Sequence, residues 1–205
     1  MRGYLGITDS FMHHDNGSDT NGAGMTAQQR RSGTDAARLR RMYIDCRYGQ
    51  LHLVTAYPSS GGFDEASPLV FLHAEDGSGA DFNAFAALLG VDRSVYAPDL
   101  PGNGASDAPP GRMTIAGLAG SIADLFEQLR LRRVDLFGCG RGAQLAFELA
   151  TTRAQDVRRL VVAGRTQPTP ATTQPVLELQ GEPARFLKEP AAATVGELRA
   201  FLDRA

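Results

Sequence analysis

The chain after residue 38 alternates between short apolar runs typical of strands and longer amphipathic stretches typical of helices. Two alternating runs, 42–48 and 51–57, flank Gly49-Gln50 and predict an antiparallel hairpin. The wholly apolar run Leu69-Val70-Phe71-Leu72 is typical of a strand buried on both faces. The same criteria predict further strands at 94–97, 133–137, 157–163 and 175–180.

Helices are expected between these strands. The predicted ranges are 82–90, 115–129, 140–150 and 191–205, with Asp81 and Thr114 as capping residues of the first two. Strands that alternate with helices predict an α/β fold, in which a mostly parallel sheet carries helices on both faces behind an N-terminal antiparallel hairpin. Ligands of such sheets bind at the carboxyl ends of the strands.

Residues 1–37 have almost no apolar periodicity, so we expect a disordered tail followed by one domain over 38–205. Within the tail, His13, His14 and Asp15 could bind a metal, but a solvated tail explains this composition better. We therefore predict no metal site. A start codon placed too far upstream, with Met25 as a later candidate, remains an alternative explanation of the segment.

Composition narrows the classes of partner. The net charge of −2 and the scattered basic residues give no reason to expect nucleic acid or an anionic membrane. No run approaches 18 apolar residues, and no basic segment precedes an apolar run, so neither a membrane span nor a secretory signal is expected. Cys46 and Cys139 do not make a disulfide framework, which favours a cytoplasmic protein. No motif indicates a cofactor.

The segment Val134–Ala143 carries the most specific motif. An apolar strand runs into a glycine-rich turn and then directly into a helix, which is the context of the nucleophile elbow G-x-Nu-x-G. Gly138 and Gly142 hold the flanking positions, where a Cβ would meet backbone. The nucleophile position is Gly140, which has no side chain that could attack a substrate.

These residues resemble the α/β-hydrolase superfamily over Arg41 to Gly164 and, more weakly, over Pro175 to Ala205. Four segments carry the resemblance in order: Leu69–Ala74, Tyr96–Asp107, the elbow Gly138-Cys139-Gly140-Arg141-Gly142, and Arg158–Gly164. The resemblance implies an α/β-hydrolase-like fold in which the last strand and the cap are reduced or absent. Residues 165–174 would be a residual cap or linker.

The catalytic triad of this family is incomplete in the chain. The family order is nucleophile, acid and then histidine, but all four histidines precede Gly140: His13, His14, His52 and His73. Glu182 is the only carboxylate in the loop where relatives often place the acid. His52 lies in an alternating strand, where a surface or packing role is expected.

The resemblance also places an oxyanion hole. Its donors would be the N–H groups of Ala74 and Arg141. His73 would order this loop as a hydrogen-bonded structural residue and would not act as a base. Glu75 and Asp76 follow at once, and their charges would oppose a developing negative charge.

We expect a pocket near the elbow, lined by His73, Asp99, Cys139 and Gly140. Cys139 precedes the nucleophile position, and we interpret it as structural because an unactivated buried thiol is inert. Asp99 and Asp107 are expected to brace their loop through backbone hydrogen bonds, as aspartate does in turns rich in glycine and proline.

Three hypotheses follow. The first is a fold member without serine-hydrolase catalysis, a pseudoenzyme whose cleft binds a small molecule or a protein. The second is a hydrolase of ester-like or other small substrates that uses His73, Asp99 or Cys139. The third is an interaction module, because loss of the eighth strand would open a sheet edge that a second copy could cover as a homodimer.

Overall fold

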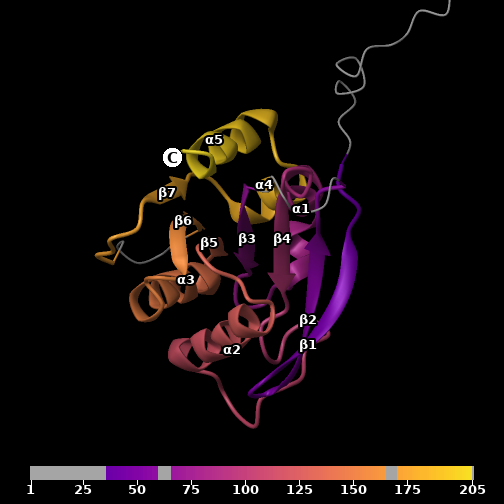
Figure 1. The fold of residues 1–205 in the computed structure, drawn as a ribbon, viewed down its shortest axis with the longest axis vertical. Coiled ribbons are helices and arrows are strands. Elements are labelled where there is room, and N and C mark those ends of the chain that lie inside the picture. Colours follow the sequence, from indigo (N-terminus) through magenta and orange to yellow (C-terminus); the bar gives the residue numbers. More distant parts are fainter. Residues whose placement is uncertain (1–35, 60–65, 165–169, 205) are drawn as a thin grey trace, which may run out of the picture. The chain divides into compact units, whose positions relative to one another are not determined.

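A seven-stranded sheet, ordered β1-β2-β4-β3-β5-β6-β7, is the centre of the fold (Figure 1). The computed structural model describes residues 36–59, 66–164 and 170–204. The strands are β1 (Arg40–Cys46), β2 (Gly49–Ala56), β3 (Ala66–Leu72), β4 (Arg93–Pro98), β5 (Val134–Cys139), β6 (Val157–Ala163) and β7 (Val176–Leu179). The helices are the 3-10 helix η2 (Gly79–Phe82) and α1 (Asn83–Leu89), α2 (Ile115–Gln128), α3 (Arg141–Thr152), α4 (Pro183–Lys188) and α5 (Ala192–Leu202).

The pairing of the strands confirms the predicted fold class. β1 and β2 form the antiparallel hairpin, and β2 is also antiparallel to β4. The other neighbours, from β4 through β3, β5 and β6 to β7, are parallel. Because parallel strands end at one edge of the sheet, the residues after β3, β4 and β5 lie near one another.

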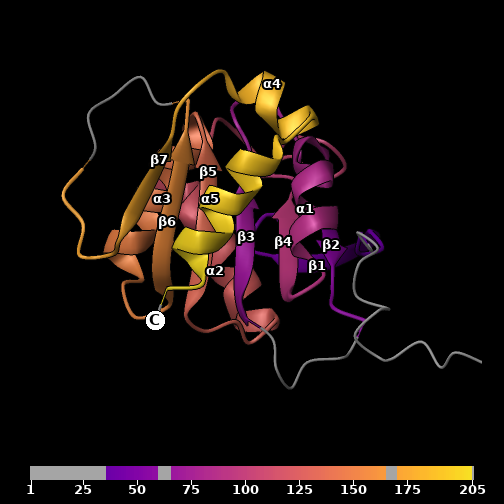
Figure 2. The same cartoon turned by 90° about the horizontal axis from the view of Figure 1, so that it is seen from above.

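Helices cover both faces of the sheet (Figure 2). On one face α2 and α3 pack against the strands, and residues such as Leu118, Ile122 and Leu145 belong to that core. On the other face α1, α4 and α5 form a second core, which contains Phe85, Leu187 and Leu198. Strands β4 and β5 are therefore buried along their whole length, whereas β7 at the edge is partly exposed.

Local details differ from prediction at two helices. Asp81 does not cap α1, because the chain first makes the turn η2 and the Asp81 carboxylate accepts the N–H of Ser78 at 3.0 Å. Thr114 does cap α2, with its hydroxyl oxygen 3.1 Å from the N–H of Gly117. Helix α4 was not predicted, because its six residues are too few to show a helical period.

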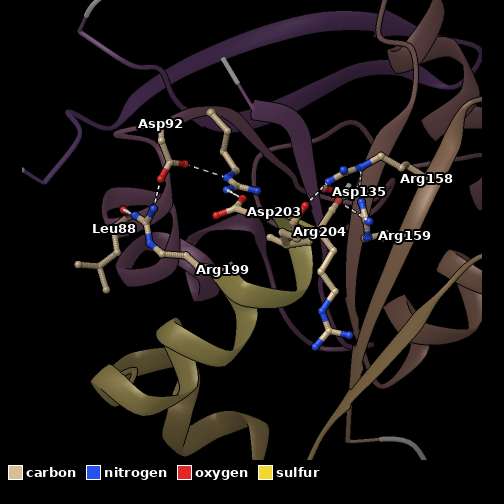
Figure 3. Close-up of polar contacts among 10 residues, drawn as sticks. Leu88, Asp92, Asp135, Arg158, Arg159, Arg199, Asp203 and Arg204 are labelled. Carbon is tan, nitrogen blue, oxygen red and sulfur yellow. Dashed lines mark hydrogen bonds and ion pairs between the residues drawn. The ribbon is translucent and has the colours of Figure 1, made fainter. Parts of the chain in front are cut away.

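Charged side chains fasten the end of α5 to the sheet (Figure 3). Arg199 pairs with Asp92 and donates to the carbonyl of Leu88 at 2.7 Å. Asp203 pairs with the fully buried Arg93 at 2.5 Å, and Arg93 also reaches Asp92 at 2.9 Å. We call Asp92, Arg93, Arg199 and Asp203 the α5 charge cluster.

Most of the predicted tail, residues 1–35, lies outside the described residues, as do 165–169 of the predicted residual cap. The N–H of Ala37, the last residue of the predicted tail, donates to the carbonyl of Ala87 at 2.7 Å. Ala37 also packs against the core beside α1. Among the described residues, no helix combines the length and apolarity that crossing a membrane requires.

Candidate active site at the elbow

The turn from β5 to α3 has the backbone of a strained elbow. Gly140 alone connects the two elements, with φ 52° and ψ −115°. A residue with a side chain rarely adopts this conformation, whereas glycine does so at little cost. The turn is held by the N–H of Gly140, 3.0 Å from the carbonyl of Ala163, and by its carbonyl, 3.1 Å from the N–H of Ala143.

The three elbow glycines stand in different surroundings. A Cβ on Gly138 would lie 2.3 Å from the carbonyl oxygen of Gly142, and one on Gly142 would lie 2.0 Å from that of Leu72. Both flanks therefore have to be glycine. A Cβ on Gly140 would approach nothing closer than the Cβ of Ala74, at 3.3 Å. A side chain at the nucleophile position would therefore need Ala74 to shift by a few tenths of an ångström, and the sequence supplies none.

The predicted oxyanion donors lie beside this turn. Ala74 follows the end of β3, and its Cβ is the nearest atom to the missing side chain of Gly140. Arg141 begins α3. Within the described residues, the backbone N–H of neither residue donates a hydrogen bond. Both groups are available to a ligand, which is the condition that an oxyanion hole requires.

Both ring nitrogens of His73 are occupied. The N–H of Leu100 donates to Nε2 at 2.8 Å, so Nδ1 carries the proton and donates to the carbonyl of Ala74 at 2.6 Å. Burial lowers the pKa of His73 below its ordinary value, against the opposing effect of that carbonyl. This neutral tautomer links the loops after β3 and β4, and it has no lone pair free to take a proton from a substrate.

The carboxylate of Asp99 is also fully engaged in structural contacts. Its carboxylate accepts the N–H groups of Gly79 at 2.7 Å and Ala105 at 2.8 Å, and it contacts Nδ1 of His52 at 2.9 Å. His52 is therefore a buried partner of Asp99, and neither a surface residue nor a simple packing residue as expected. The carboxylate of Asp107 accepts from the backbone of the β1–β2 hairpin at 2.8 Å. Both aspartates brace the loop after β4.

Cys139 is the last residue of β5 and is 1% exposed. Burial, together with the charge of Asp81, raises the pKa of its thiol to about 12. Nucleophilic attack needs the thiolate, which is scarce at neutral pH for such a group. The side chain is part of the core that contains α1 and α5.

Glu75 and Arg141 form an ion pair beside the elbow. Nη1 of Arg141 lies 3.2 Å from Oε1 of Glu75, and its Nη2 donates to the carbonyl of Met113. The carbonyl of Glu75 accepts the side-chain amide of Asn103 at 2.9 Å. The guanidinium of Arg141 thus partly neutralises the negative charge of Glu75, which was expected to oppose an oxyanion. This ion pair was not predicted from the sequence.

A cavity of about 230 Å³ lies beside this pair. Its wall comes from the loops after β3 and β4 and from the beginnings of α2 and α3: Glu75, Leu100, Pro101, Gly102, Asn103, Pro109, Gly111, Arg112, Met113, Leu118 and Arg141. None of the four predicted pocket residues lines it. His73, Asp99 and Cys139 are buried among their own partners, and Gly140 has no side chain to extend. The signal that could have indicated this place was Arg141, next to the nucleophile position.

The position of the family's acid offers no substitute. Glu182 is exposed and directly precedes Pro183, the first residue of α4. Within the part of the chain that the structure describes, no three His, Cys, Asp or Glu side chains are grouped to hold a metal ion. The candidate metal-binding residues His13, His14 and Asp15 lie outside it.

Comparison with known sequences gives a family and distant relatives. A family model described as alpha/beta hydrolase fold matches residues 67–201. A putative 2-succinyl-6-hydroxy-2,4-cyclohexadiene-1-carboxylate synthase of Bacillus subtilis is 30% identical over 107 residues, which are 51% of this chain and 39% of that protein. A 2-hydroxy-6-oxo-2,4-heptadienoate hydrolase of Pseudomonas putida is 33% identical over 105 residues, or 48% and 37%. An uncharacterised protein of Mycobacterium bovis is 31% identical over 94 residues, 46% of this chain but 28% of its own length.

Solved structures agree on the fold. An epoxide hydrolase superposes with a TM-score of 0.57 and 24% identity, over 65% of this chain and 47% of its own. A haloalkane dehalogenase of Agrobacterium tumefaciens gives a TM-score of 0.54 and 24% identity, over 62% and 41%. The chain therefore spans less than half of the length of each of these relatives.

Proposed function

This chain belongs to the alpha/beta-hydrolase fold family, and from that premise we propose that it lacks serine-hydrolase catalysis and binds a small molecule beside Arg141. The observation that carries the proposal is the elbow itself. Gly140 keeps the strained turn of the elbow, but it has no side chain. Within this chain, no histidine follows it to act as the base.

The side chains that could replace the triad support the same conclusion. His73 has both nitrogens bound, Asp99 accepts from two backbone N–H groups, and Cys139 is a buried thiol of high pKa. Nucleophilic catalysis needs an activated nucleophile within reach of a base. None of these groups is both accessible and activated.

Binding is the activity that the remaining features support. The cavity is lined by Arg141, whose backbone N–H has no partner among the described residues, and by Glu75, the neighbour of Ala74. The names of two relatives refer to reactions of small organic molecules, a cyclohexadiene carboxylate and a heptadienoate. A fold that keeps the loops of such a site without the triad retains the means to bind a ligand.

A cytoplasmic location is part of the proposal. Cys46 and Cys139 are both free thiols, which is the usual state in a reducing compartment. The two lie on different strands, β1 and β5.

The test is hydrolysis by the purified chain. We expect no labelling by a fluorophosphonate probe and no turnover of p-nitrophenyl butyrate above the buffer rate. Parallel preparations of Cys139→Ser and His73→Ala serve as controls for a contaminating esterase. Turnover that persists through purification but disappears in either variant would contradict the proposal and favour a hydrolase with non-standard catalytic residues.

A further inference from the structure

The cavity beside the elbow combines positive charge with an apolar lining. Arg112 and Arg141 are the two positively charged residues of its lining, and Glu75 is the one negatively charged residue. Leu100 and Leu118, which are both buried, contribute apolar surface. Guanidinium groups bind carboxylates through charge-assisted hydrogen bonds, and small-molecule sites pair a few such groups with apolar walls.

Arg112 is the freer of the two arginines. It is exposed, and among the described residues no carboxylate lies within ion-pair distance of it. Its charge is therefore available to a ligand without the loss of an existing pair.

The guanidinium of Arg141 already binds a carboxylate, that of Glu75, as it would bind the carboxylate of a ligand. Its Nη1 contacts the carboxylate of Glu75, whose side chain is 58% exposed, whereas that of Arg141 is 24% exposed. The bond from Nη2 to the carbonyl of Met113 holds the guanidinium in place if Glu75 moves away. Exposed ion pairs contribute little to stability, so a ligand could replace the Glu75 carboxylate at small cost.

We propose that this cavity binds a small monocarboxylate, whose carboxylate replaces that of Glu75 on Arg141 and is also attracted by Arg112. The cavity of about 230 Å³ has the volume of about eight water molecules, which suits a short-chain acid such as hexanoate. The inference rests on the proposed function, in which the site binds a ligand without hydrolysing it.

The test is isothermal titration calorimetry of the full chain with hexanoate at neutral pH and low salt. Hexanamide has the same shape without the charge. We expect its affinity to be at least about tenfold lower than that of hexanoate. Hexylammonium, which carries the opposite charge, should not bind.

Three variants separate the groups. Arg141→Gln should weaken hexanoate binding about tenfold, and Arg112→Gln, an exposed change that leaves the fold intact, should weaken it about threefold. Glu75→Gln removes the competing carboxylate and should strengthen binding about two- to fivefold. Arg153→Gln is the matched control, because Arg153 pairs with Glu127 beyond the far end of α3 and should leave affinity unchanged.

The outcomes distinguish this inference from the proposed function. Equal affinity for hexanoate and hexanamide, absence of hexanoate binding, or hexanoate binding that is insensitive to both arginine variants would overturn the carboxylate assignment. None of these results bears on catalysis. Turnover of p-nitrophenyl butyrate, measured on the same preparations, would overturn the proposed function whatever the order of affinities.

Discussion

Gly140 leaves the elbow without a nucleophile, and its positive φ determines how much stability a substitution there would lose. We expect Gly140→Ser to fold, because a shift of a few tenths of an ångström at Ala74 relieves its 3.3 Å contact, but to lose about 1–3 kcal/mol to backbone strain. Gly138→Ala should prevent folding, because its Cβ would overlap the backbone of Gly142 at 2.3 Å. Urea denaturation followed by circular dichroism measures both. Equal stability losses in the two variants would contradict this description of the turn.

The buried His73 predicts a pH dependence of stability. Its pKa is lowered in the folded state, chiefly by burial, so below pH of about 6.5 the unfolded chain takes up a proton that the folded chain does not. Stability should therefore be fully present above that pH and fall, by at most about 1.4 kcal/mol per pH unit, as the pH drops towards the folded pKa.

The measurement is urea denaturation of wild type and His73→Gln between pH 7.5 and 5. His73→Gln should be less stable throughout but should lose less stability on acidification. Val162→Ala, a core variant on β6, is the control, since it should keep the wild-type slope. The prediction fails if His73→Gln and Val162→Ala show the same slope.

At the scale of elements, α5 depends on the α5 charge cluster. The side chain of Arg93 is 1% exposed, and its Nη1 has no partner among the described residues, so Arg93 relies on Asp92 and Asp203 for compensation. Removing one partner of a buried ion pair leaves an uncompensated charge. Asp92→Ala would also deprive Arg199 of its partner.

We therefore expect Asp92→Ala to lower the free energy of unfolding by about 3 kcal/mol. Glu127→Ala is the matched control, because the Glu127 side chain in its pair with Arg153 is 60% exposed and should contribute less than about 1 kcal/mol. Urea denaturation compares the two. Losses of the same size would mean that the cluster is no stronger than an exposed pair.

The elements were largely predictable because their signals are local. The apolar runs of β3 and β6 and the cap Thr114 each determine one strand or helix. The site was less predictable, because it depends on contacts between distant segments. The pair of Glu75 with Arg141 spans 66 residues, and that of His52 with Asp99 spans 47. Neither leaves a periodic pattern in the sequence, so the missing nucleophile could be recognised but the cavity could not be placed.

The sheet has an edge at β7, which in the described residues pairs with β6 alone. The N–H of Leu160 donates to the carbonyl of Pro175 at 3.0 Å, so the backbone of Pro175 faces β6. Because successive residues of a strand face opposite sides, the N–H groups of Val176 and Glu178 point away from β6, towards the open edge. Such an edge can pair with another chain. We propose weak homodimerisation through this edge.

Sedimentation equilibrium over a wide concentration range tests the dimer. We expect wild type to associate as its concentration rises and Glu178→Pro, which removes an outward N–H, to remain monomeric. Thr151→Ala, on α3 and remote from the edge in sequence, should associate like wild type. A wild-type chain that is monomeric at the highest concentration would exclude the dimer.

The hydrogen bonds of the loop after β4 also bear on how fast a ligand enters. Leu100, in the cavity wall, is held by His73, and Ala105 is held by the buried Asp99, which also contacts the hairpin through His52. This part of the wall is thus anchored to the core, and the displacement of the exposed Glu75 side chain is the one rearrangement that binding requires. The observed rate of association should then rise linearly with ligand concentration, and differences in affinity among acids should appear in their residence times.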